Sequence, residues 1–437
     1  MNQTTMNQTT MELTKVSNKN LQARKEQAIS AGMANLSAVY VERAKNACLW
    51  DVEGNRYIDF GSGIAVSNTG HSHPRIIEAV KAQLDKFSHT CAMITPYAPF
   101  VELAEQLIKR VPISEPVKAM FVTTGSEAVE NAIKVSRAST GRSGVISFKG
   151  GFHGRTCMAM GLTGKMNPYK AGFGPFPAEI YHAQFPNAFH GISVNDAIQS
   201  LNDLFFCDIE PSRVAAIIFE PVQGEGGFYQ APPEFAQALR EICDQHGIVL
   251  IADEVQSGFA RTGKMFACEY LGIEPDLMTM AKGIAGGFPI SALVGKAKIM
   301  DAATPGSLGG TYGGSPLGCV AGLEVLKIIE DEQLCDKALA IGELMGSRLK
   351  HLQQSFPVIG DVRVLGAMVA MELVDQSGKP AVDLTKALVT SARERGLILL
   401  SCGVRGNVIR LLPPLTIEKE VLDEGLQILE QCLIACG

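Results

Sequence analysis

The sequence predicts an α/β protein in which a large domain, with a mostly parallel sheet covered by helices, is joined to a smaller α+β domain. Three observations indicate this fold class. Short, continuous apolar runs alternate with helical patterns between about residues 118 and 296, as expected for strands buried on both faces. Near residue 318 the pattern changes to long helices with a few short strands. The length of 437 residues is also too great for one ordinary core.

The N-terminal part of the chain opens with a polar five-residue unit written twice, MNQTTMNQTT. A repeat this short cannot form a solenoid, and we expect residues 1–25 to be a disordered extension. Residues 47–60 have the pattern of a β-hairpin, and a proline favours the start of a helix over 74–86, with another helix near 98–110. Because about 60 residues alone would make a weak core, we expect residues 26–70 to pack with the small domain.

Residues 71–318 form the expected large domain, which contains most of the apolar runs. Strands are predicted at 118–125, 144–150, 214–222, 248–255, 276–282 and 291–296. Helical periodicity between these runs predicts helices at 126–140 and 233–247. Alternating strands and helices favour a parallel sheet with helices on its faces.

Residues 319–437 form the expected small domain. Helices are predicted at 317–331, 335–354, 383–395 and 417–435, and short strands at 366–373 and 408–414. Long helices combined with a few short strands favour an α+β unit for this part of the chain.

The composition excludes several classes of protein. A chain with 46% hydrophobic and 19% charged residues is globular in type. A net charge of −6 argues against a general binder of nucleic acid or of anionic membranes. No run of about 18 apolar residues is present, and the polar N-terminus lacks the apolar core of a secretory signal. We therefore expect a cytoplasmic protein.

The cysteines and histidines predict neither a disulfide framework nor a metal site. The eleven cysteines are scattered and include no CxxC pair, which is typical of reduced thiols in a cytoplasmic enzyme. His71 and His73, in the segment GHSHP, have no HExxH motif or Cys/His cluster to support them. A turn before a helix is the better interpretation of that segment.

Polar groups gather at the expected strand ends, where open α/β sheets bind ligands. In TTGSEAVENA (123–132) a strand ends at Gly125 and a helix begins with Ser126. Free backbone N–H groups at a helix N-terminus, together with a serine hydroxyl, suit a phosphate. Taken alone, Ser126 is more simply a helix cap. No P-loop motif is present, so a nucleoside triphosphate is not implied.

Two further strand ends carry an acid and a lysine. Asp253 ends the run LIADEV, where its carboxylate could hold a protonated ring nitrogen. Lys282 ends the run MTMAK and is followed by Gly283 and other small residues. A half-buried lysine has a lowered pKa, which makes its amine a usable nucleophile for a Schiff base, whereas a lone lysine is more often a surface residue. Together with the candidate phosphate site at Gly125 and Ser126, this pair favours pyridoxal phosphate as cofactor.

At this point the sequence resembles the class III (ω-) aminotransferases, of the fold-type I superfamily of pyridoxal-phosphate enzymes. The resemblance is collinear from about residue 30 to the end of the sequence. It is carried by TTGSEAVENA, FHGRT, EPVQGEGG, DEVQSGFARTG, AKGIAGGFP and GGTY. Within the class, NTGHSHP, SHTC, RGLILLSCG and VIRLLPPLTIE are most similar to bacterial 4-aminobutyrate aminotransferases.

The resemblance implies roles for residues around the cofactor. Lys282 would form the Schiff base and later move the proton, and Asp253 would pair with the pyridine nitrogen. The phosphate would be bound by Gly125 and Ser126, and by Thr311 of a neighbouring subunit. The remaining contacts with the ring and its phenolic oxygen would come from Phe152, Val255 and Gln256. Sharing Thr311 implies a homodimer or homotetramer.

The resemblance also implies how two kinds of carboxylate are recognised. Arg155 would bind the carboxylate distal to the reacting amine, and Arg410 the α-carboxylate of glutamate. Glu225 would pair with Arg410 when 4-aminobutyrate is bound, because a buried arginine without a partner is costly. Glu220 and Ile64 would line the same pocket. Arg405 is a rival for the α-carboxylate, and Glu225 could equally be a solvated acid in a glycine loop.

The implied reaction is ping-pong transfer of the amino group from 4-aminobutyrate to 2-oxoglutarate, which gives succinic semialdehyde and glutamate. Two departures weaken the choice of donor: Phe152 stands where the nearest enzymes tend to have tyrosine, and Met93 where they commonly have glutamine. Alternative donors are 5-aminovalerate, ornithine, acetylornithine and putrescine. Racemisation or decarboxylation with the same cofactor is a further alternative, and a binding protein without activity is disfavoured because Lys282 and Asp253 are present.

Overall fold

The computed structural model describes residues 16–436, so the N-terminal repeat lies outside the described residues. Helix α2 (Asn18–Ala28) occupies part of the segment that was expected to be disordered, and that expectation is wrong for its residues. The helix buries none of its residues. It is held instead by its cap, Ser17, and by a bond of 2.8 Å from Asn18 Nδ2 to Asp51. A prediction based on apolar composition therefore misses it.

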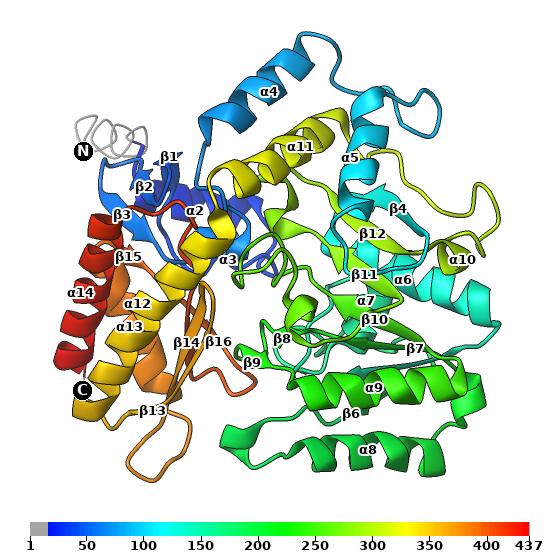
Figure 1. The fold of residues 1–437 in the computed structure, drawn as a ribbon. Coiled ribbons are helices and arrows are strands. Elements are labelled where there is room, and N and C mark those ends of the chain that lie inside the picture. The colour runs from blue at the N-terminus through cyan, green and yellow to red at the C-terminus, as the bar shows by residue number, and fades with distance from the viewer. Residues whose placement is uncertain (1–15, 437) are drawn as a thin grey trace, which may run out of the picture.

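A seven-stranded sheet forms the centre of the molecule (Figure 1). Its strands lie in the order β4 (Val117–Val122), β12 (Ser291–Lys296), β11 (Leu277–Met280), β10 (Val249–Asp253), β7 (Val214–Phe219), β5 (Gly144–Phe148) and β6 (Ile180–Ala183). Only β12 runs against the others in this sheet, pairing antiparallel with both β4 and β11. The predicted, mostly parallel sheet is confirmed, and β6 is a strand that the sequence did not predict.

Both faces of this sheet are buried, which explains the unbroken apolar runs. On β7, Ile217 and Ile218 point to opposite faces and belong to different apolar clusters, each with no exposed surface. Helices α6, α7 and α10 cover one face, and α5, α9 and α11 contribute to the other. The helices of this part of the chain are α4 (Pro74–Leu84), α5 (Ala98–Ile108), α6 (Gly125–Thr140), α7 (Cys157–Leu162), α8 (Val194–Cys207), α9 (Pro233–His246), α10 (Ala297–Met300) and α11 (Pro316–Asp331).

The N-terminal and C-terminal segments share a second sheet. Its strands are β1 (Val41–Lys45), β2 (Cys48–Asp51), β3 (Arg56–Asp59) and β15 (Leu397–Ile398). The short helix α3 (Ser62–Ala65) follows β3 in the chain. Strand β15 pairs in parallel with β3, with Leu397 opposite Ile58. The N-terminal hairpin is thereby attached to a strand more than 300 residues later in the sequence.

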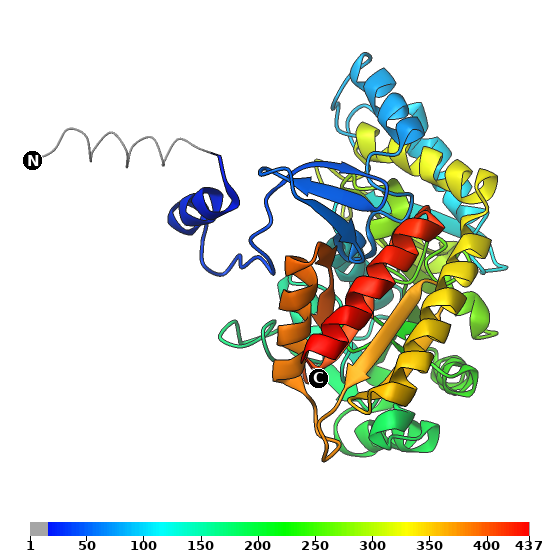
Figure 2. The same cartoon turned by 90° about the vertical axis from the view of Figure 1, so that its left-hand side faces the viewer.

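A third sheet lies in the C-terminal part, beneath three helices (Figure 2). Its order is β13 (Ile359–Leu365), β14 (Met368–Leu373), β17 (Val408–Leu411) and β16 (Leu400–Cys402), and every neighbouring pair is antiparallel. The helices are α12 (Leu334–Ser355), α13 (Val382–Glu394) and α14 (Lys419–Cys436). A small hairpin of β8 (Val222–Gln223) and β9 (Tyr229–Gln230) lies between this part and the central sheet.

Within residues 16–436, no helix is long and apolar enough to cross a membrane. In the same range, no group of three or more histidine, cysteine, aspartate or glutamate side chains is arranged to hold a metal ion.

Candidate active site

A pocket of about 730 Å³ opens at the ends of β4, β10 and β11. Of the residues that the resemblance gives a role at the cofactor or the substrate, all except Thr311 line it: Ile64, Gly125, Ser126, Phe152, Arg155, Glu220, Glu225, Asp253, Val255, Gln256, Lys282 and Arg410. Strand β17 of the third sheet contributes Arg410, so the pocket lies between the central sheet and the C-terminal part. Thr311 is the exception, because it is exposed and does not line the pocket.

Lys282 lies two residues beyond β11, in the short turn η4 (Lys282–Ala285). The strand therefore ends at Met280, earlier than predicted. The φ of Lys282 is 48°, a left-handed conformation that side chains other than glycine seldom adopt and that tends to occur at functional sites. Burial lowers the pKa of its amine, although the Glu225 carboxylate opposes the shift. A lowered pKa increases the share of the neutral amine, the form that attacks carbonyl carbons.

Asp253 ends β10 with both carboxylate oxygens engaged. Its Oδ1 accepts hydrogen bonds from Thr279 Oγ1 at 3.0 Å and from the N–H of Val255 at 3.1 Å. Its Oδ2 lies 2.7 Å from Nδ1 of His153. Burial lowers the pKa of this imidazole, but the hydrogen bond to Asp253 and the charges of Asp253 and Glu220 together outweigh it, and the net shift is upward. The carboxylate is thus held in one orientation, with the imidazole of His153 beside it.

No pattern in the sequence predicted a role for His153, although it lies inside the motif FHGRT. The residue is only 4% exposed and sits in a loop between β5 and α7, where no periodicity shows which way a side chain points. The one signal in the sequence was its position next to Phe152, the residue expected to stack on the ring.

The N-terminus of α6 is capped by Thr124, one position before the helix. Its side chain accepts from the N–H of Glu127, whose carboxylate in turn accepts from the N–H of Thr124. Ser126 is therefore not the cap, contrary to the simpler interpretation of the sequence. Its hydroxyl lines the pocket and accepts from the N–H of Arg155 at 3.1 Å. This arrangement leaves a hydroxyl and a helix N-terminus facing the same space.

Glu220 and Gln256 lie deeper in the pocket. The Glu220 carboxylate accepts from the N–H of Phe152 at 2.8 Å and from that of Gly224 at 3.0 Å. Burial raises the pKa of Glu220 to about 7, with the nearby imidazolium of His153 opposing the shift. The Oε1 atom of Gln256 is buried and has no hydrogen-bond partner among the described residues. An unsatisfied buried acceptor in a pocket indicates a place for a ligand donor.

The other end of the pocket is built around a buried ion pair. Arg410, 2% exposed, donates from Nη1 to Glu225 Oε1 at 2.5 Å. Burial raises the pKa of Glu225, but Arg410 outweighs this and the net shift is downward. Tyr169 donates its hydroxyl to the second oxygen, Oε2, at 3.0 Å. Arg155, by contrast, is exposed, and its guanidinium carbon lies 5.4 Å from the centre of the Tyr169 ring.

Arg405, the rival of Arg410, does not line this pocket. It lines a separate cavity of about 240 Å³ together with Lys149 and Glu372. The two arginines are close in sequence but line different cavities, because Arg410 lies on β17 and Arg405 lies in the loop before it. Arg410 is the one that can meet a ligand beside Lys282.

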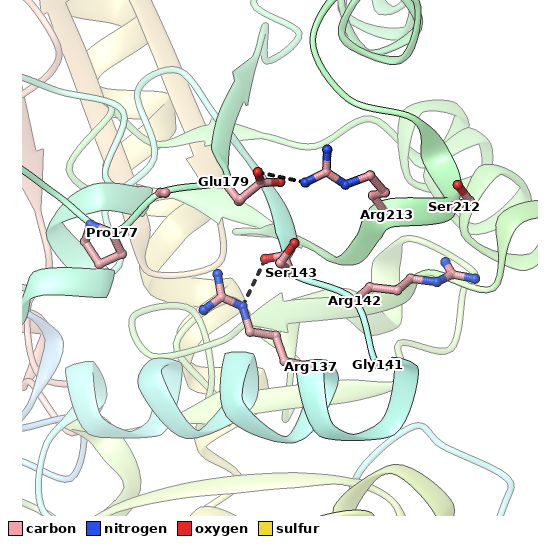
Figure 3. A pocket seen from close by; sticks show the side chains of 9 residues that line it. Arg137, Gly141, Arg142, Ser143, Pro177, Glu179, Ser212 and Arg213 are labelled. Carbon is pink, nitrogen blue, oxygen red and sulfur yellow. Dashed lines mark hydrogen bonds and ion pairs between the residues drawn. The ribbon is translucent and has the colours of Figure 1, made fainter.

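A third hollow, of about 670 Å³, lies far from these strand ends, at the C-terminus of α6 (Figure 3). Its three arginines are already occupied. Arg137 donates to the carbonyl of Ser143, Arg213 pairs with Glu179 at 2.8 Å, and Arg142 donates to three backbone carbonyls. The negative end of a helix and the carboxylate of Glu179 both disfavour an anion here.

Comparison with protein families and curated proteins gives a consistent result. The family model described as aminotransferase class-III matches residues 28–433. A protein of Pseudomonas aeruginosa named 5-aminovalerate aminotransferase DavT is 54% identical over 417 residues, which cover 95% of this chain and 98% of the relative. The 4-aminobutyrate aminotransferase GabT of Escherichia coli is 53% identical over 418 residues, with the same two coverages.

Solved structures of similar proteins have the same fold. An amine transaminase from an uncultivated Pseudomonas species, solved in a PLP-bound form, superposes with a TM-score of 0.85 at 29% identity and covers 94% of this chain and 99% of its own. The ornithine aminotransferase of Toxoplasma gondii also gives a TM-score of 0.85, at 27% identity, and covers 99% of this chain and 98% of its own.

Proposed function

The chain belongs to the class-III aminotransferases, whose cofactor is pyridoxal phosphate, and on that premise we propose that it moves the amino group of 4-aminobutyrate to 2-oxoglutarate. The products would be succinic semialdehyde and glutamate. The observation that supports a donor with a single carboxylate is the buried pair of Arg410 and Glu225 beside Lys282. Arg410 would be a cationic site that Glu225 occupies when the substrate has one carboxylate and that a second substrate carboxylate can take over.

The residues of the pocket fit the cofactor. The hydroxyl of Ser126 and the N-terminus of α6 suit its phosphate. The unpartnered Oε1 of Gln256, a buried acceptor, suits a protonated oxygen or nitrogen on a ring. Phe152 and Val255 line the pocket and offer apolar faces for stacking.

Pyridoxal phosphate supplies an electrophilic carbon for amines and a ring that withdraws electrons from the bond to be broken. Asp253, oriented by His153 and Thr279, would keep the ring nitrogen protonated. Lys282 would accept the proton released from the substrate carbon and hold it on Nζ for its return. Burial lowers the pKa of this amine, which increases the share of the neutral form that can accept a proton. The walls of the pocket would exclude competing water.

The two arginines would sort the substrates. Arg155 would bind the carboxylate of 4-aminobutyrate at the far end of the molecule. Arg410 would then stay paired with Glu225, so no buried charge is left alone. Glutamate and 2-oxoglutarate carry a second carboxylate, which would replace Glu225 on Arg410. Ile64 and Glu220 would line the space between the two ends.

5-Aminovalerate is the second candidate donor, favoured by the name of the 54% identical relative. It has one methylene more than 4-aminobutyrate and the same single carboxylate. One methylene in an apolar pocket changes transition-state binding by only about 1–3 kcal/mol. The ion pair serves both donors equally, so kinetics have to separate them.

The test is a half-reaction. The purified holoenzyme is mixed with excess 4-aminobutyrate or 5-aminovalerate, without 2-oxoglutarate, and the visible absorbance and the released semialdehyde are followed. We expect the absorbance to bleach with both donors, faster with 4-aminobutyrate. Lys282→Ala should lose at least about 1,000-fold in rate, because the general base is gone, and Lys298→Ala, which changes an exposed lysine, should lose nothing. Bleaching with glutamate alone would refute both donors and direct the search to ornithine-type amines.

A second copy of the chain would complete the pocket. Thr311 is exposed in a loop that also carries Tyr312, and the ring of Tyr312 lies 5.0 Å from that of His89. Around this loop Met93 is 61%, Ile94 77% and Tyr312 65% exposed, and large apolar side chains that are exposed close together are typical of an interface. We infer that a partner covers this patch and receives Thr311 at its own phosphate site. Light scattering of the holoenzyme checks the mass.

A further inference from the structure

Tyr169 contacts Arg155 at one end of the pocket and Glu225, the partner of Arg410, at the other. It belongs to the loop between α7 and β6 and lines the pocket. Its ring centre is 5.4 Å from the guanidinium carbon of Arg155 and 4.7 Å from the ring centre of Phe152. Its hydroxyl is 3.0 Å from Oε2 of Glu225. No motif in the sequence pointed to it.

The carboxylate of Glu225 has one partner on each oxygen. Oε1 accepts from Arg410 and Oε2 from Tyr169, so the two bonds together define one position of the side chain. Burial raises the pKa of the Tyr169 phenol, and the Glu225 carboxylate raises it further. The phenol therefore remains protonated, and its proton is available to donate.

The backbone of Glu225 is fixed independently of these bonds. Its carbonyl accepts from the N–H of Gly403 at 3.0 Å, and the carbonyl of Gly403 accepts from Lys165 Nζ at 2.7 Å. The peptide around Glu225 is therefore anchored to the C-terminal part. Movement of the carboxylate away from Arg410 needs only rotation of the side chain, and the bond to Tyr169 opposes that rotation.

We propose that Tyr169 is a positioning residue that sets substrate specificity by holding Glu225 on Arg410. The inference rests on the proposed function, because it concerns the choice between substrates with one and with two carboxylates. A monocarboxylate leaves both bonds of Glu225 intact. A dicarboxylate has to displace Glu225 and therefore breaks the bond to Tyr169 as well as the ion pair. The hydroxyl thus biases the pocket toward ω-amino monocarboxylates.

Equilibrium binding to the holoenzyme tests this directly. Tyr169→Phe keeps the ring against Phe152 and Arg155 and removes only the hydroxyl. Dissociation constants for butyrate and glutarate, two unreactive acids, are measured by calorimetry. We expect glutarate to bind about tenfold more tightly to Tyr169→Phe than to the unchanged enzyme, the effect of one hydrogen bond to a charged group. The constant for butyrate should stay the same.

Two controls separate this role from a general effect on folding. Tyr270→Phe removes a hydroxyl that donates to the carbonyl of Thr262, outside the pocket, and should change neither constant. In a Glu225→Ser background there is no carboxylate to hold, so Tyr169→Phe should have no further effect. An unchanged ratio of the two constants in Tyr169→Phe, or an equal change in the Glu225→Ser background, would overturn the proposal. Because both acids are unreactive, this result is independent of whether 4-aminobutyrate and 5-aminovalerate are donors.

Discussion

At the scale of single residues, Glu225 shows best how far a sequence can be interpreted. In sequence it is one acid in the glycine-rich segment QGEGG, which suits a solvated loop equally well. In the structure its carboxylate is largely buried against Arg410, 185 residues away in the chain. Its role depends on that pairing, and no local pattern in the sequence encodes it.

Replacing Glu225 by serine should therefore affect the two half-reactions unequally. With 4-aminobutyrate bound, Arg410 would be a buried charge without a partner, and breaking such a pair costs about 3–5 kcal/mol. We expect kcat/KM for 4-aminobutyrate to fall at least about 100-fold, and that for glutamate much less, because glutamate supplies its own carboxylate to Arg410. Stopped-flow absorbance of each half-reaction measures both.

Glu241→Ser is the matched control for this prediction, since Glu241 is an exposed acid on α9. It should leave both half-reactions unchanged. Equal losses for 4-aminobutyrate and glutamate in Glu225→Ser would show that Glu225 supports the pocket in general and does not sort substrates.

Residues at or just beyond the end of a strand were predictable from the pattern of the sequence, and those in the middle of long loops were not. Asp253 and Lys282 follow apolar runs, so the rule that ligands bind at strand ends places them together. His153 and Tyr169 lie in loops, where chain direction depends on tertiary contacts. The resemblance to a family supplied the roles of Arg155, Glu225 and Arg410 as expectations, and the structure shows that these side chains lie in one pocket.

At the scale of elements, the start of α6 depends on close approach by a neighbouring loop. Gly154 has a φ of 129°, and a Cβ atom there would lie 2.0 Å from Ser126 Oγ. Only glycine allows the loop to pass so near the helix N-terminus. The proposed phosphate site would thus be made by two elements, α6 and the loop before α7, and a helix-cap pattern alone describes half of it.

Gly154→Ala should therefore weaken cofactor binding. The methyl group would displace the Ser126 hydroxyl, and loss of one hydrogen bond to a charged phosphate corresponds to about a 10- to 100-fold rise in the dissociation constant of pyridoxal phosphate. Titration of the apoenzyme, followed by absorbance, measures it. Gly378→Ala also has a positive φ, 78°, but an open surrounding, and should bind normally. Equal weakening in both variants would point to backbone strain and not to Ser126.

At the scale of the whole molecule, a buried cluster joins the central part to the C-terminal part. Glu372 of β14, 1% exposed, accepts from Tyr229 at 2.5 Å, lies 2.9 Å from His190 Nε2, and pairs with Arg363 at 2.9 Å. Tyr229 and His190 come from the central part, and Arg363 comes from β13. The pocket lies between the same two parts, so this cluster helps to set the distance between Arg410 and Lys282.

The sequence predicted these two parts from the change of pattern near residue 318, but not what joins them. Strand β13, which carries Arg363, was missed because none of its residues except Ile359 is buried, so it lacks a clear alternation. The parallel pairing of β3 with β15 follows from no local signal either, since β15 has only two residues. Contacts between distant segments are decided by packing, which a single sequence does not display.

Glu372→Gln should destabilise the fold, and the loss should depend on pH. Burial raises the pKa of Glu372, but its hydrogen bond from Tyr229 and the charge of Arg363 outweigh this, and the net shift is downward. A carboxyl with a lowered folded pKa contributes stability above its unfolded pKa and loses it as pH falls through the folded pKa. The variant should therefore lose about 3 kcal/mol near neutral pH, where Arg363 would lack its partner, and less in acid.

Urea unfolding of the holoenzyme at about pH 7.5 and at about pH 3, below the ordinary pKa of a glutamate, measures this difference. Glu343→Gln, an exposed change on α12, should match the unchanged protein at both pH values. A loss in Glu372→Gln that is the same at both pH values would mean that shape, and not charge, makes the cluster stabilising. A pH-dependent loss accompanied by weaker glutarate binding would instead connect the cluster to the pocket, because Glu372 and Arg410 lie on neighbouring strands, with Ala370 of β14 opposite Arg410 of β17.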